Sequence, residues 1–75
     1  MTAFGNEYSS ITVKYDTEAR LVSFDVFDMN GHSVAKASTA GENGEFAFNQ
    51  LLRAGVYVVK MTAGNEVVVQ QVMVK

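Results

Sequence analysis

The chain has 75 residues, of which 48% are hydrophobic, and a formal net charge of −2. This length allows one small domain, and the hydrophobic content excludes an intrinsically disordered chain. The absence of cysteine excludes a disulfide framework and thiolate metal sites, and the weak negative charge argues against general nucleic-acid binding. No apolar run is long enough for a membrane helix and the start does not resemble a signal peptide, so any export signal is expected upstream.

Apolar and polar residues alternate with a period of two through most of the chain, which predicts strands and no helix. The expected strands cover residues 10–16, 20–27, 32–39, 45–50, 56–62 and 66–75. The third of these has a weak apolar stripe, and we expect it at a sheet edge with Lys36 opposing further pairing. Residues 1–9 would form either a seventh edge strand, through Phe4 and Tyr8, or a frayed leader.

Turn-forming residues separate these strands at short intervals. Asp28 and Gly31 occupy the first and fourth positions of a predicted type I turn, and residues 40–44 have the composition of a loop. Gly64-Asn65 predicts a two-residue hairpin of type I′ or II′. Six or seven short strands with regular turns indicate an all-β fold, a small antiparallel Ig-like β-sandwich, over residues 10–75.

The last predicted strand is apolar on both faces. Val67, Val69 and Met73 lie on one side, and Val68, Val72 and Val74 lie on the other. A strand of this kind is usually central in its sheet or covered by a partner. We keep both alternatives, because a receptor could also add a strand to it.

Aromatic residues fall mainly on the predicted inward positions. Phe24, Phe46, Phe48 and Tyr57 should pack in the core. Phe27 is out of phase with them, and it would either pack under the following turn or be exposed to a ligand.

The residues needed for catalysis or metal binding are missing from the pattern. His32 is the single histidine, and Asp25 and Asp28 are expected to point to opposite faces of a strand. Calcium-loop, Walker and dinucleotide-binding motifs are absent as well. We therefore expect no enzyme activity, no cofactor and no metal site.

Three segments, residues 25–34, 54–61 and 64–75, follow one another in an order and spacing that resemble the C-terminal sorting domain of the type IX secretion system. Residues 25–34 match the family's hydrophobic strand, Asp-x-x-Gly turn and return strand. Residues 54–61 are similar to its Gly-x-Tyr strand, and residues 64–75 resemble its closing hairpin with a terminal lysine. The resemblance covers about residues 11–75, and it identifies these candidate motif and translocon-recognition residues: Asp28, Gly31, Gly55, Tyr57, Gly64, Val72, Val74 and Lys75.

The chain departs from the family pattern at several positions. His32 replaces a usual arginine, Arg53-Ala54 replaces a frequent proline, and Gln70 and Gln71 stand where a basic residue is common. The Asn-Pro segment that often opens the domain is also absent. These departures suggest a missing or altered first edge strand, which would leave a sheet edge open to a strand-exchanged homodimer.

The resemblance implies a secretion signal rather than a catalyst. Such a domain sits behind an N-terminally fused cargo, crosses the inner membrane unfolded, folds in the periplasm and is recognised by the outer-membrane translocon. A sortase-like peptidase then removes it, and the cargo is left at the cell surface or secreted. The alternative function is an accessory binding or adhesion module that holds a glycan or protein through loop residues such as Phe27 and His32.

Overall fold

The computed structural model covers residues 1–75 and describes every side chain except that of Asn43. The described chain consists of seven strands and one 3-10 turn, Gly41–Asn43. The strands are β1 (Thr2–Gly5), β2 (Ile11–Lys14), β3 (Leu21–Phe27), β4 (Ser33–Ala40), β5 (Glu45–Ala47), β6 (Gly55–Ala63) and β7 (Glu66–Val74). The described residues include no helix with the length and apolarity needed to cross a membrane.

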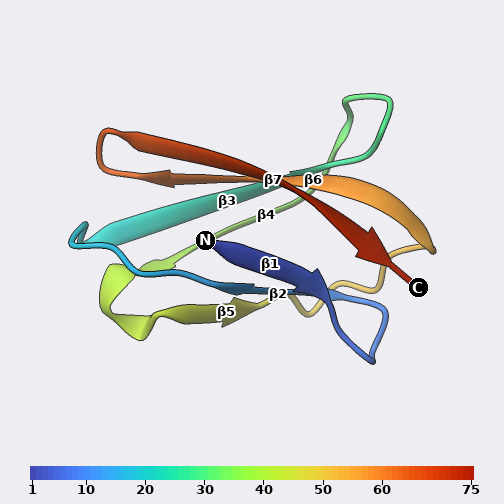
Figure 1. Ribbon diagram of the computed structural model, residues 1–75, viewed down its shortest axis with the longest axis horizontal. Helices are drawn as coiled ribbons and strands as arrows, with labels where there is room; N and C mark the ends of the chain where they lie inside the picture. The colour runs from blue at the N-terminus through green and yellow to red at the C-terminus, as the bar shows by residue number, and fades with distance from the viewer.

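The strands form two antiparallel sheets that pack face to face. The first sheet has the order β1-β2-β5, and the second has the order β4-β3-β6-β7. Figure 1 shows that β1, at the N-terminus, lies beside the C-terminal half of β7 and runs in the same direction. This arrangement confirms the predicted all-β, Ig-like sandwich.

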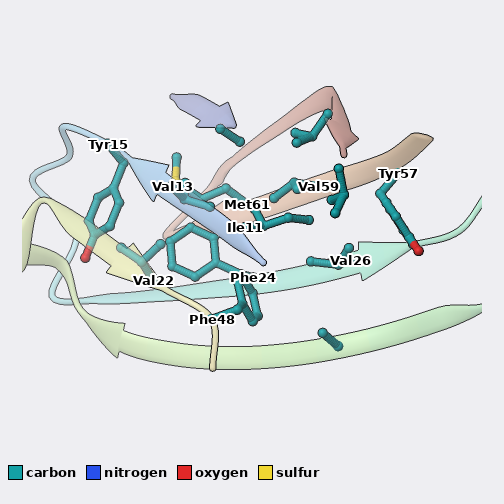
Figure 2. Close-up of a cluster of buried hydrophobic side chains, with 14 of the residues drawn as sticks. Ile11, Val13, Tyr15, Val22, Phe24, Val26, Phe48, Tyr57, Val59 and Met61 are labelled. Carbon is teal, nitrogen blue, oxygen red and sulfur yellow. The ribbon is translucent and has the colours of Figure 1, made fainter. Parts of the chain in front are cut away.

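The alternating sequence pattern places one face of each strand in the core. Val22, Phe24 and Val26 of β3 are almost fully buried, and so are Ile11 and Val13 of β2. Figure 2 shows these side chains meeting those of Val59 and Met61 between the sheets. Each fully buried side chain of this kind contributes about 1.5–3 kcal/mol.

Phe24 is the centre of the aromatic part of the core. Its ring centroid lies 5.4 Å from that of Tyr15, 5.6 Å from that of Phe46 and 6.3 Å from that of Phe48. Because Phe24 belongs to one sheet and Phe46 to the other, these contacts hold the two layers together. The predicted inward positions of Phe24 and Phe48 are confirmed, while Phe46 is only half-buried.

The strand after the 3-10 turn is shorter than predicted. β5 ends at Ala47 because the following carbonyls bond to a side chain instead of a neighbouring strand. The buried hydroxyl of Ser10 donates to the carbonyl of Phe48 at 2.6 Å and lies 2.8 Å from that of Gln50. The N–H groups of Phe48 and Leu52 still donate to the carbonyls of Ile11 and Ser9, so this segment stays beside the start of β2.

The structure decides two questions that the sequence left open. Thr2–Gly5 forms a strand paired with β2, so of the two alternatives for residues 1–9 the structure has the edge strand, and the first strand is not missing. β7 pairs only with β6 and is an edge strand, so the first of the two alternatives for this strand, a central position, is excluded. The predicted edge position of β4 is confirmed.

Candidate functional site

The closing strand β7 has apolar side chains on both faces, of which one face is buried and the other is exposed. Val72 and Val74 point into the core and are 3% and 1% exposed. Val67, Val69 and Met73 point outward and are 56%, 60% and 63% exposed. Val67–Val74 contains no charged residue, although the exposed Lys60 of β6 lies opposite Val69 on the same face.

Neighbouring strands extend the apolar surface of β7. Met73 lies opposite Val56, and Gln71 lies opposite Val58, which is half-exposed on β6. We name the exposed residues of β7 together with these two neighbours the outer patch; its members are Val56, Val58, Val67, Val69 and Met73. The outer patch thus combines three exposed side chains of β7 with two half-buried side chains of β6 on one sheet face.

The β3–β4 turn is formed as predicted and uses its polar atoms internally. The backbone N–H groups of Asn30 and His32 both donate to Asp28 Oδ1 at 2.9 Å. The N–H of Gly31 donates to the carbonyl of Asp28 at 3.0 Å, and Gly31 has a φ of 85°. A side chain would strain this left-handed conformation, so Asp28 and Gly31 have a structural role here.

The residues of the Gly-x-Tyr segment are also structural in position. Gly55 opens β6 opposite Val74. Tyr57 is 8% exposed, and its hydroxyl donates to the carbonyl of Arg53 at 2.7 Å. Figure 2 shows the Tyr57 ring at the end of the core with its hydroxyl directed outward. This bond fixes the corner that leads into β6.

Gly64 lies in the two-residue loop between β6 and β7, with a φ of 61°. A positive φ at the first loop residue alone is typical of a type II′ turn, one of the two predicted types. The register places this loop at one end of the sheet and the remaining seven candidate residues at the other. The eight candidates therefore do not form one site.

Two of the candidates on β7 are buried, so their side chains contribute to the core and are not accessible to a receptor. Val72 and Val74 are inside the domain, while Lys75 is exposed at its end. In the folded chain, a receptor would reach the outward residues Val67, Val69 and Met73 instead. The sequence pattern contained this signal, since β7 is apolar on both faces and one face must remain outside the core.

The residues named by the alternative function lie at the β3–β4 end of the molecule. Phe27 is half-buried on the outward side of β3, opposite Val58, and the side chain of His32 is 78% exposed. His32 Nδ1 lies 3.6 Å from Asp28 Oδ2. Among the described side chains, no group of three or more potential metal ligands occurs.

A polar contact between β7 and β1 was missed by the sequence analysis. The Gln70 side chain accepts a hydrogen bond from the Ala3 N–H at 3.1 Å and donates to the Ala3 carbonyl at 2.9 Å. Gln70 interrupts an inward row that is otherwise Val68, Val72 and Val74. A lone amide in such a row is the signal that could have indicated a buried backbone partner.

The fold and the exposed terminal strand define a small Ig-like module with a distinctive C-terminal edge. The model of the secretion system C-terminal sorting domain matches residues 7–75, which is nearly the whole chain. The chain belongs to this family of type IX secretion sorting domains. Comparison with curated proteins and with solved structures gives no match.

Membership of the family has direct functional meaning. The family consists of C-terminal sorting signals, which are generally non-catalytic and lead to export to the cell surface or to secretion. It implies an interaction with the type IX secretion machinery and an N-terminal cargo.

Proposed function

We propose that this chain is a non-catalytic signal that delivers an attached cargo to the outer-membrane translocon of the type IX system. The cargo reaches the periplasm, this domain folds there, and the translocon then captures it through β7. A sortase-like peptidase afterwards separates the domain from the cargo. The observation that carries the proposal is the exposed, uncharged apolar row of Val67, Val69 and Met73 on the closing strand.

Two features of β7 suit it to recognition by a receptor. It is an edge strand, so it is bonded to a neighbouring strand of its own sheet on one side only. Its outward side chains are exposed at alternate positions, which is how strand addition combines affinity with specificity. Fused cargoes of different sequence could use the same strand, because none of its recognition elements belongs to the cargo.

The test is a secretion assay with a fluorescent reporter fused upstream of the chain, in a cell that has the type IX system. Deletion of residues 72–75 should abolish export, but it also removes the buried Val72 and Val74 and so damages the core. A sharper variant is the double substitution Val67→Thr and Val69→Thr. Threonine keeps the branched shape that strands favour while it places a hydroxyl on the outward face.

The double variant should lower surface export about tenfold or more, as expected for loss of two contacts worth about 1 kcal/mol each. Leu51→Thr is the matched control, because Leu51 is 73% exposed and lies outside β7; its export should be normal. Wild-type export by the double variant would refute the role of the outer patch. Saturable ligand binding by the domain that is lost with Phe27→Ala would instead favour the adhesion alternative.

A further inference from the structure

The outer edge of β7 is covered by β1, which belongs to the opposite sheet. A Cβ atom built on Gly5 would overlap the carbonyl oxygen of Met73, and it would lie 3.2 Å from the Cα of Val74. The backbones of the two strands therefore approach closely at this point, and only glycine allows it. Because backbone groups alternate along an antiparallel strand, Val69 and Gln71 direct their carbonyls to the same side as Met73. Figure 1 shows β1 following this edge.

Gln70 fastens β1 to β7. Its side-chain amide bonds to both the N–H and the carbonyl of Ala3, which is the pattern that a neighbouring backbone would provide. Ala3 is 5% exposed, so these two bonds are shielded from water.

Besides this clamp, β1 is held by a four-residue antiparallel ladder with β2, and it buries little of its own side-chain surface. The strand has four residues, Thr2 is exposed, and Phe4 remains 39% exposed. Ala3 is its single fully buried side chain among those described. A terminal strand of four residues with so little buried apolar surface opens more readily than the core strands, even though its pairing with β2 must also break.

The position immediately after β1 is firmly attached to the domain. The Asn6 side chain accepts bonds from the N–H groups of Tyr8 and Ser10, and it donates to the Thr12 hydroxyl. If β1 leaves, the chain therefore hinges between Gly5 and Asn6. The match to the sorting-domain family begins at residue 7, so β1 lies just outside the matched domain.

We propose that β1 is a displaceable strand that covers the outer edge of β7, and that Gln70 is the clamp that holds it there. When β1 leaves, the edge of β7 becomes a docking site for one extended polypeptide strand in the same direction. Residues upstream of the matched domain thus control access to the terminal strand. The consequence for export rests on the sorting function proposed above.

The clamp is tested by residue-resolved hydrogen exchange on the full chain with Gln70→Ala. The amides of Phe4 and Gly5 report the release of β1, whereas the Ala3 amide is set aside because Gln70 is its own acceptor. Loss of two hydrogen bonds should speed exchange at Phe4 and Gly5 roughly ten- to a hundredfold. Exchange at Val59, in the centre of the core, should change less than twofold if only β1 is released.

Gln71→Ala is the matched control, because Gln71 is the adjacent glutamine with its side chain on the exposed face. It should leave the amides of Phe4 and Gly5 at their wild-type rates. Equal rates in the Gln70 and Gln71 variants would overturn the proposal. An equal rise at Val59 would also overturn it, because Gln70 would then support the whole fold instead of β1.

The link to export is measured separately with the reporter fusion. If β1 must leave before capture, Gln70→Ala should export faster than Gln71→Ala, by up to the factor seen in exchange. An unchanged or lower rate would overturn the control of access while the sorting function stands. Failure of the wild-type fusion to be exported would refute the sorting function alone, and the exchange result would still decide whether Gln70 clamps β1.

Discussion

The two edge strands of the four-stranded sheet are protected in different ways. β4 is polar along its outward side, with Ser33, Lys36 and Ser38 exposed. β7 is uncharged over Val67–Val74 and exposes three large apolar side chains. The charge of Lys36 belongs to β4 itself and always discourages pairing. The protection of β7 depends instead on β1, which we propose can leave.

The edge of β4 is therefore always protected against strand pairing, whereas the edge of β7 can pair with another strand once β1 has left. A domain that had to be recognised through β4 would need to pair with a strand carrying Lys36, which opposes this contact. β7 keeps an apolar row and a backbone edge, and β1 is held against this edge by contacts of Gly5, Ala3 and Gln70 in addition to its own pairing with β2. Under the proposed function, recognition therefore belongs to β7 at one end of the sheet order, while β4 at the other end stays polar.

The largest expected effect comes from removing the core that supports both edges. Phe24 is 2% exposed and contacts three aromatic rings. Phe24→Ala should lower the free energy of unfolding by about 3–5 kcal/mol, because it leaves a cavity between the sheets. Urea denaturation of the full chain measures the change. A loss below about 1 kcal/mol would mean that the edges do not depend on this cluster.

Two further substitutions have smaller expected effects on stability, and each tests one of the two edge strands. Gly31 and Gly64 both have a positive φ, and they lie in the turns that lead to β4 and β7. Alanine at either position should cost about 1–2 kcal/mol, because L-residues disfavour the left-handed conformation. Hydrogen exchange should rise most in β4 for Gly31→Ala and most in β7 for Gly64→Ala. The same pattern of rises in both variants would contradict the independence of the two edges.

Local features of the fold were predictable from the sequence, and long-range ones were not. The alternation around Phe24, the turn from Asp28 to Gly31 and the Gly64-Asn65 loop each depend on neighbouring residues, and all three are confirmed. The edge position of β7 depends on which strands pair, which the alternation does not encode. A strand with two apolar faces signals only that one face needs a cover.

In the candidate site, too, local features were predictable from the sequence and long-range contacts were not. Tyr57 was expected in the core and is buried there, because its phase in the strand is a local property. Val72 and Val74 were named for recognition but are buried, since a motif match does not say which face is inward. The contact of Gln70 with Ala3 spans almost the whole chain; the lone amide in the inward row signals a polar partner, but no local pattern identifies Ala3 as that partner.

The smallest effect on stability should come from exchanging the properties of the two edges. Lys36→Val makes β4 resemble β7, and Val69→Lys makes β7 resemble β4. Both side chains are exposed, so each change should alter the free energy of unfolding by less than about 0.5 kcal/mol. Solubility should nevertheless change in opposite directions, because a charge at an edge blocks strand pairing between molecules. Light scattering at increasing concentration should show faster association for Lys36→Val and slower association for Val69→Lys. Equal association of the two variants would mean that edge charge does not distinguish β4 from β7, and the difference between the edges would then lie in the β1 cover alone.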